Sequence, residues 1–390
     1  MSVLTVVQRE LRMMFVSQPK IAAVLFGVPV LYVLLFGMLY SASVVKYIPT
    51  VIYDQNQTEV SRTLVQAFED SERFHVVAYT ASQEDADDYL RNEAAQAAIV
   101  IPPDFSRDIK RGSSAQVLVI VNGTNLLFAN PVVGSAQEIV QTFSAGAGRQ
   151  LMEKAGQLPE TALGSSAPVR FGLRILNNPT YGYANFIVGG LGANGLQLGI
   201  VLAICTTLTS IFRRLEEWQG ISSWQIVLGK LLPYWLWGVV SYLTYLVIAY
   251  QFLLLPVKGS LLELLMVGSA FVFAVSSIGL FYSAIAPNEI QAIQLPIAYI
   301  MPAFLFSGYI WPDFAMNTFS KIVSSILPLT YAAVDIRDLM LTGYAPALYK
   351  DCLVLSVMGG VLFILSIGVV SFRRHRIENG QRKLSGEGAE

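Results

Sequence analysis

The chain has 390 residues, of which 54% are hydrophobic and 14% are charged, and its formal net charge is −1. Soluble domains carry about 25% charged residues, so a chain this poor in charge lacks the polar surface of a soluble protein. The near-zero net charge gives no basis for predicting a nucleic-acid partner. Two cysteines and two histidines, far apart in sequence, argue against a disulfide framework and a zinc site.

The first 20 residues predict a helix that lies in the cytoplasmic interface of a membrane. Apolar side chains gather on one helical face and Gln8, Arg9 and Arg12 on the other, ahead of a turn at Pro19. A cytoplasmic extension of the first membrane span is the alternative interpretation. The apolar face consists of Val3, Leu4, Val7, Leu11, Met14 and Phe15.

Six runs without any Asp, Glu, Lys or Arg are long enough to cross a bilayer, which takes about 20 apolar residues. The first run is longer than the ~7–15 apolar residues of a signal peptide, so we expect a retained helix rather than cleavage near residues 41–43. The runs cover residues 21–45, 185–212, 231–257, 264–287, 290–312 and 352–372.

Lysine and arginine beside these runs orient them across the membrane. The opposite short loops contain only Lys258, Lys321, Arg337 and Lys350. With six spans, the positive-inside rule places both termini in the cytoplasm and residues 46–184 outside. The basic side of the membrane collects Arg9, Arg12, Lys20, Arg213, Arg214, Lys230, Arg373, Arg374, Arg376, Arg382 and Lys383.

The segment 46–184 is long enough to form a domain of its own. Its alternating strand-type and helix-type runs predict an extracytoplasmic α/β domain. Residues 313–351 are expected to form an external loop, and the polar residues 373–390 a disordered cytoplasmic tail. The strand-type runs are 50–53, 75–79, 97–101 and 116–121, and the helix-type runs are 59–70, 83–92 and 131–154.

The source of energy for any transport is predicted to lie outside this chain. Ion-coupled carriers usually keep charged residues within the membrane, and these six runs have none. The segment Leu228-Gly229-Lys230-Leu231 lacks the upstream glycine and the following Ser or Thr of a Walker A loop. We therefore expect no ATPase site, metal or cofactor in this chain, and a separate subunit that hydrolyses ATP.

Residues 213–224, a cytoplasmic loop between the second and third spans, combine charge with tryptophan. Arginine and aromatic residues dominate interface hot spots, so an exposed Trp218 on this loop is a candidate contact for a partner. An anchor made of positive charge and an interfacial tryptophan fits these residues equally well.

Polar side chains inside the spans are candidates for the lining of a substrate pathway. Hydrogen bonding and packing between helices is the alternative role for such residues. The candidates are Asn194, Gln197, Tyr242, Tyr245, Gln251, Gln291 and Gln294.

Several segments, in order along nearly the whole chain, resemble those of type-2 ABC exporter permeases with a large external domain after the first helix. The opening strand and acidic turn at 48–56, the AIVIPPDFS segment at 98–106 and the LGKLLPY segment at 228–234 are similar to that family. So are SGYIWP at 307–312 and LPLTY at 327–331, followed by Arg337 and Gly343.

The resemblance implies a half-transporter in the plasma (inner) membrane of a prokaryote. Two copies would surround a pathway, and two ATP-binding subunits, which hold ATP and Mg²⁺, would energise it. A periplasmic adaptor and an outer-membrane channel are further partners of Gram-negative members. The resemblance places the ATP-binding subunits against Arg213, Arg214, Glu216, Glu217, Trp218 and Trp224 of the loop, and near Asn288 and Glu289.

Two departures separate this chain from the family pattern. The coupling stretch is shortened to residues 213–223 and lacks a Gly-Thr pair, and Val188-Gly189-Gly190 stands where the family usually has Val-Pro-Gly. The leading hypothesis remains an ATP-driven exporter of amphiphilic or hydrophobic compounds, namely drugs, lipids or peptides. The alternatives are a membrane sensor whose external domain binds a ligand, and an ion-coupled carrier.

Overall fold

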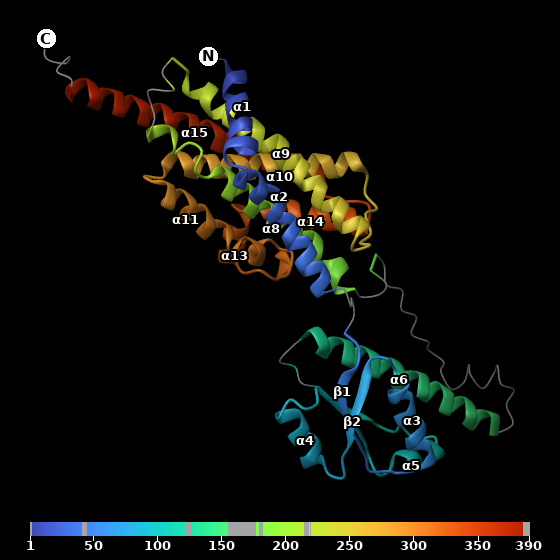
Figure 1. Cartoon of the computed structure of the whole chain (residues 1–390). Helices are drawn as coiled ribbons and strands as arrows, with labels where there is room; N and C mark the ends of the chain where they lie inside the picture. The colour runs from blue at the N-terminus through green and yellow to red at the C-terminus, as the bar shows by residue number, and fades with distance from the viewer. Residues whose placement is uncertain are drawn as a thin grey trace. The chain divides into compact units, whose positions relative to one another are not determined.

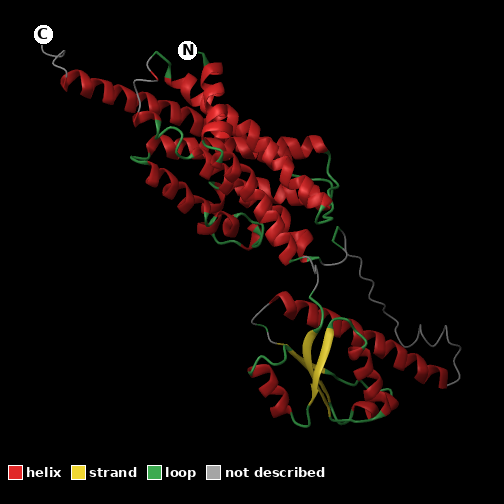
Figure 2. Cartoon of the chain, in the orientation of Figure 1, coloured by secondary structure: helices red, strands yellow, loops and turns green. Residues whose placement is uncertain are grey.

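The computed structural model describes residues 2–40, 45–121, 123, 126–154, 177–178, 182–213, 218 and 220–384. The chain divides into a helical unit, residues 1–43 and 175–390, and a sheet unit, residues 44–174. Figure 1 labels the elements, and Figure 2 shows that the described strands all belong to the sheet unit.

The helical unit begins with α1 (Val3–Arg12), a π-helical turn (Met13–Ser17) and the first long helix, α2 (Lys20–Leu39). After the sheet unit, the chain returns with α8 (Tyr183–Ile204), a 3-10 turn (Ile211–Arg213), α9 (Ser223–Gln251) and α10 (Leu261–Ile285). The remaining helices are α11 (Glu289–Ile300), α12 (Ala303–Phe306), α13 (Thr318–Ser325), α14 (Pro328–Leu341) and α15 (Leu348–Leu384), with a 3-10 turn at Asp313–Ala315.

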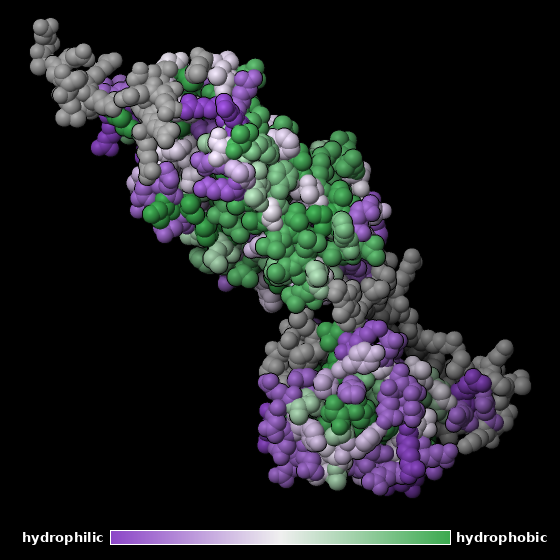
Figure 3. Space-filling model, viewed as in Figure 1, coloured by the Kyte–Doolittle hydropathy of each residue, from purple (hydrophilic) through white to green (hydrophobic). Residues whose placement is uncertain are grey.

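The prediction of six membrane spans is confirmed for the part of the chain that the structure describes. Six segments are long and apolar enough to cross a membrane, and the bent pair α13 and α14 is a seventh candidate. The fifth segment, Glu289–Phe306, is divided into α11 and α12 by a break at Met301 and Pro302. Apolar residues cover most of the visible surface of the helical unit in Figure 3, as a bilayer requires.

Two regions in the C-terminal part of the chain differ from the sequence-based expectations. The tail beyond residue 372, predicted to be disordered, continues α15 as a helix to Leu384. Its good helix formers and an i,i+4 contact at 3.9 Å between Arg374 and Glu378 favour this extension. The predicted external loop contains α13 and α14, and α14 packs against α8, α10 and α15. Charges at Asp335, Arg337 and Asp338 interrupt the apolar pattern that would have revealed this helix.

The sheet unit has four strands in the order β2-β1-β3-β4: β1 (Ile48–Asp54), β2 (Phe74–Tyr79), β3 (Ala97–Ile101) and β4 (Leu118–Val121). β1 runs parallel to β2 and β3, whereas β4 is antiparallel to β3. All four predicted strands and the three predicted helices are present, with small shifts at their ends. The predicted helices are α3 (Glu59–Glu69), α4 (Gln83–Arg91) and α6 (Leu126–Lys154), and the described residues also include a short helix that was not predicted, α5 (Phe105–Lys110).

Helices cover both faces of this sheet, which explains why the central strand β3, with the sequence AAIVI, is apolar throughout. One core joins Ile52 and Ile99 to α3, α5 and α6, and Phe68 is buried within it. A smaller core on the other face joins Val51 and Ala98 to Ala86 of α4. The alternation of these residues along β1 and β3 follows the two-residue period of a strand.

Close helix contact in the helical unit depends on glycine at Gly268, where a Cβ atom would lie 2.2 Å from Cε1 of Tyr242. We predict that Gly268→Ala lowers the free energy of unfolding by about 1–3 kcal/mol through overpacking. Thermal denaturation in detergent measures this change. The matched control is Gly360→Ala in α15, where no atom lies within 4 Å of the added Cβ. An equal loss in both variants would contradict the prediction.

Candidate functional site

The candidate site is the end of the helical unit where α1 meets the first turns of α9, which we call the α1 end. Val6 and Met14 are buried, whereas Leu4 is 63% exposed. α1 and the π-helical turn after it therefore bury Val6 and Met14 against the protein, while Leu4 of the predicted apolar face is exposed. A Cβ atom at Gly229 of α9 would lie 2.6 Å from Cβ of Val6, so the two helices are in close contact.

A buried ion pair joins α1 to α9. Nζ of Lys230 lies 2.7 Å from Oε2 of Glu10, and both side chains are 2% exposed. The Tyr234 hydroxyl donates a hydrogen bond to Oε1 of Glu10 at 3.1 Å. A buried ion pair is tolerated only when its geometry and additional hydrogen bonds compensate for lost hydration, and this arrangement supplies both.

The loop between α8 and α9 is fixed to this ion pair through Trp218. Its side chain is 5% exposed. The Arg9 guanidinium lies 4.6 Å, and the Lys230 ammonium 5.4 Å, from the centre of the indole ring. Cations at these distances over an aromatic face are attracted by its quadrupole. The expectation that Trp218 is exposed is therefore wrong. The ring is buried because Arg9 of α1 and Lys230 of α9 pack against it.

Two arginines of α15 hold the backbone of the same region. Arg374 donates hydrogen bonds to the carbonyl oxygens of Ile221, at 2.6 Å, and Trp218, at 3.3 Å. Arg373 donates to the carbonyls of Ala284 and Ala286, at 2.6 and 2.8 Å, where α10 ends. These bonds satisfy carbonyl groups that helix ends and loops leave without partners. The last span is thereby tied to both connections at the α1 end.

The end of α8 is attached to α10 in a similar way. The Ser283 hydroxyl accepts hydrogen bonds from the backbone N–H groups of Leu208 and Thr209, at 2.9 and 3.2 Å. Thr209 donates to the Ser283 carbonyl at 2.7 Å. The segment that leads from α8 into the loop is thus held by α10, and the segment that leads from the loop to α9 is held by α15.

The remaining predicted coupling residues are distributed around this end. Trp224, in the first turn of α9, is 50% exposed. Asn288 caps α11 by accepting a hydrogen bond from the Gln291 N–H at 2.9 Å, and Glu289 follows it as the first residue of that helix. Arg214, Glu216 and Glu217 lie outside the described residues, as does the side chain of Arg213.

The candidate pathway residues fall into two groups. Gln197, Tyr242 and Tyr245 are fully buried, and their polar atoms have no hydrogen-bond partner among the described residues. Asn194 is half-buried with an unpartnered Oδ1. The second group, Gln251, Gln291 and Gln294, is exposed on the surface of the single chain. The structure therefore does not bring all seven residues into one cavity.

The sheet unit is inserted after the first helical span, and the anchored basic loop follows the second span. This order of elements agrees with that of a known family. The family model of the ABC-2 family transporter protein matches residues 20–367. The chain belongs to this family.

The relatives of this ABC-2 permease include transport proteins of Escherichia coli strain K12. The probable multidrug ABC transporter permease YbhS is 27% identical over 278 residues, which are 68% of this chain and 70% of the relative. The probable multidrug ABC transporter permease YbhR is 24% identical over 338 residues, 84% of this chain and 86% of the relative. The inner membrane transport permease YhhJ is 26% identical over 341 residues, 84% of this chain and 85% of the relative.

Glu10, Tyr234 and Arg374 of this ABC-2 permease belong to the site but were not predicted from the sequence. Glu10 is the only acidic residue before Asp54. It lies four residues after Val6 and four residues before Met14. That spacing places a carboxylate on a helical face that is otherwise apolar, which was a usable signal for a buried partner. The bonds that Arg374 makes to Trp218 and Ile221 had no comparable signal, because they join residues more than 150 positions apart.

Proposed function

We propose that this ABC-2 permease is the transmembrane half of an ATP-driven exporter of amphiphilic or hydrophobic compounds. The anchoring of the loop by Trp218 and Arg374 is the observation that supports it most directly. A partner that pushes on the loop would move α1, α9 and α15 together, because buried contacts join all three to Trp218. Packed elements transmit such displacements because protein interiors are close-packed.

The proposed partner is a separate ABC ATP-binding subunit that docks at the α1 end. Trp224 and the start of α11 at Asn288 offer exposed and half-exposed contacts on two neighbouring connections. ATP and Mg²⁺ would be bound by that subunit alone. Basic side chains concentrated at this end, among them Arg9, Arg12 and Lys20, favour the cytoplasmic side for it, and the sheet unit then lies outside, where it would meet a periplasmic adaptor.

A second copy of the chain would complete the pathway. α11 carries Gln291 and Gln294 on its exposed surface, beside Ile290, which is 68% exposed. Amide side chains in contact with lipid are costly, because hydrocarbon satisfies none of their hydrogen bonds. Pairing of two α11 surfaces would remove these amides from lipid and place them along a shared pathway.

The proposal is tested in proteoliposomes that contain the permease and its ATP-binding subunit. Combined substitution of Glu216, Glu217 and Trp218 with alanine should abolish ATP-dependent transport while the protein still inserts in the membrane. Unchanged transport by this variant would count decisively against the loop as the coupling site. Collapse of the proton gradient at constant ATP separates this function from the ion-coupled carrier, since efflux should continue.

A further inference from the structure

The first turns of α8 are in contact with Tyr309, which belongs to the SGYIWP segment between α12 and α13 and is 2% exposed. Its hydroxyl accepts a hydrogen bond from the Gly190 N–H at 3.1 Å and donates one to the Phe186 carbonyl oxygen. Phe186 and Gly190 are four residues apart, so these are the two groups that an uninterrupted α-helix joins to each other. The hydroxyl therefore competes with α8 for one of the helix's own hydrogen bonds. We call this arrangement the Tyr309 contact.

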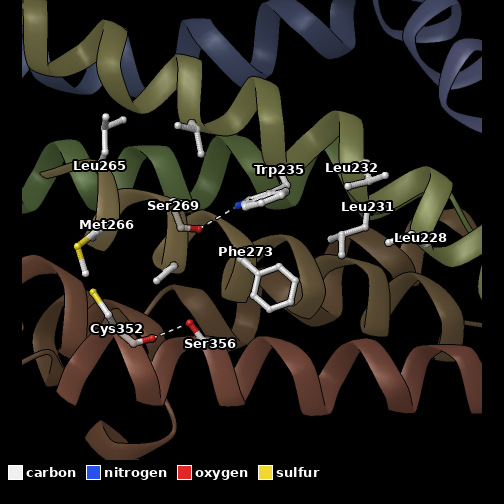
Figure 4. A pocket seen from close by; sticks show the side chains of 12 residues that line it. Leu228, Leu231, Leu232, Trp235, Leu265, Met266, Ser269, Phe273, Cys352 and Ser356 are labelled. Carbon is white, nitrogen blue, oxygen red and sulfur yellow. Dashed lines mark hydrogen bonds between the residues drawn. The ribbon is translucent and has the colours of Figure 1, made fainter. Parts of the chain in front are cut away.

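The contact that Trp235 of α9 makes with α10 is of a different kind (Figure 4). Its indole N–H donates to the Ser269 carbonyl at 3.1 Å, where both residues line an apolar groove. An indole N–H only donates, so it can take the carbonyl of a helix but not the N–H that the helix pairs with that carbonyl. A phenol hydroxyl both donates and accepts, so Tyr309 can take both members of the pair.

Neighbouring residues hold the Tyr309 ring against α8. Gly190 makes room for it, since a Cβ atom there would lie 2.5 Å from Cζ of Tyr309. The Ser307 hydroxyl accepts a hydrogen bond from the Tyr309 N–H at 3.3 Å. The Arg337 guanidinium of α14 lies 5.1 Å from the centre of the Tyr309 ring and 5.9 Å from that of the Phe186 ring. The contact therefore joins α8, the turn at 307–309 and α14.

Withdrawal of the hydroxyl would leave neither backbone group of α8 without a partner. The Phe186 carbonyl and the Gly190 N–H can bond to each other once Tyr309 has moved away, because they have the spacing of an α-helical pair. Backbone groups without partners are costly inside a membrane, and this exchange avoids that cost for α8. The first turns of α8 therefore have two arrangements, one held by Tyr309 and one released, and both satisfy the helix backbone.

We propose that Tyr309 is a positioning residue of the transport cycle, which holds the first turns of α8 in this structure and releases them when transport is energised. This inference rests on the proposed export function. α8 also carries Asn194 and Gln197, roughly one and two turns beyond Gly190, so a shift of its first turns changes the surroundings of these amides. A partner that binds the released arrangement more tightly than the held one would shift α8 between them.

Tyr309→Phe, which removes the hydroxyl and keeps the ring, tests the role in transport. In proteoliposomes with the ATP-binding subunit, the transport obtained per ATP hydrolysed should fall about fivefold or more, because α8 is no longer held. The melting temperature in detergent should stay near that of the wild type, because Phe186 and Gly190 then bond directly. Wild-type coupling in this variant would overturn the proposal, as would a melting temperature lowered as far as that of a core-cavity variant.

Two further variants of the chain serve as controls for this measurement. The Tyr331 hydroxyl donates to a single backbone carbonyl, that of Ser325 at 2.8 Å, so Tyr331→Phe should leave both coupling and melting temperature unchanged. Replacement of Tyr309 with 4-aminophenylalanine, whose amine also donates and accepts, should restore the coupling that Tyr309→Phe loses. A lack of rescue would count against the hydroxyl as the group that acts.

The exchange itself is measured without ATP or the partner, by ¹⁹F NMR of the purified chain with 3-fluorotyrosine at position 309 alone. Saturation transfer should connect a main resonance, from the held ring, with a minor one, from the released ring. Gly190→Ala should move most of the signal to the minor position, because the added Cβ displaces the ring. Gly27→Ala in α2, where no atom lies within 4 Å of the added Cβ, should not.

The absence of a minor resonance in the wild-type chain would overturn the proposal, and this result does not depend on whether Gly190→Ala folds. The two measurements also separate the Tyr309 contact from the proposed function. Absence of ATP-driven efflux by the wild type would refute the exporter, while exchange of the ring in detergent would still be observed. Normal efflux by Tyr309→Phe would instead refute the role of Tyr309 and leave the exporter intact.

Discussion

Replacement of Glu10 with alanine is expected to reduce the free energy of unfolding by about 3–5 kcal/mol, because Lys230 then remains buried without its anion. Both side chains of the pair are 2% exposed, so solvent cannot screen the uncompensated charge. Tyr234 loses its hydrogen-bond acceptor in the same variant. Thermal denaturation of the purified protein in detergent, compared with the wild type, measures the loss.

The double variant Glu10→Leu with Lys230→Met is the control for this prediction. Apolar side chains of similar volume restore packing without a buried charge, so stability should return to near the wild-type value. A double variant as unstable as Glu10→Ala would show that the helix contact, and not the charge balance, determines the effect. Arg12→Ala, on the exposed side of α1, should change stability by less than about 0.5 kcal/mol.

The single variants Trp218→Ala and Trp224→Ala should have different effects, one on the transmission of energy and the other on the binding of the ATP-binding subunit. Trp224 is 50% exposed, so its loss should weaken binding of the ATP-binding subunit by about fivefold or more, as expected for an interface aromatic. Trp218 is 5% exposed, so its loss should leave binding nearly intact and greatly reduce the transport obtained per ATP hydrolysed. Surface plasmon resonance and coupled transport–ATPase assays measure the two quantities.

Trp311→Ala is the matched control, since Trp311 is 59% exposed and lies on a different connection of the helical unit. It should alter neither subunit binding nor coupling. The reverse pattern, in which Trp218→Ala abolishes binding and Trp224→Ala has no effect, would exclude the assigned roles.

The periodic parts of the fold were predictable from the sequence. β3 occupies residues 97–101, and α4 begins at Gln83 after the Ser82 cap, as expected from local patterns. Spans were predictable because runs of about 20 uncharged residues have few other structural solutions. α14 was not predictable. It is short and contains Asp335, and a short segment with a charged residue looks like a polar loop in the sequence, although Asp335 is buried in the structure.

The location of the candidate site could be predicted from the sequence more readily than the contacts within it. Basic charge and tryptophan indicated the loop at 213–224, but not that Trp218 is enclosed by Arg9 and Lys230. Burial of a side chain at a loop depends on which distant helix packs against it, and no local period reports this. The helical continuation of α15 to Leu384 was missed because polar composition alone does not distinguish an exposed helix from a disordered tail.

In the proposed mechanism, an ATP-binding partner that docks at the α1 end supplies the energy for transport. The most direct measurement is accumulation of an amphiphilic dye in proteoliposomes that contain the permease with or without that partner, with the proton gradient collapsed by an uncoupler. We expect ATP-dependent accumulation of the dye only when both proteins are present. In matched vesicles that keep an imposed ion gradient and contain no ATP, accumulation of the dye by the permease alone would contradict this source of energy.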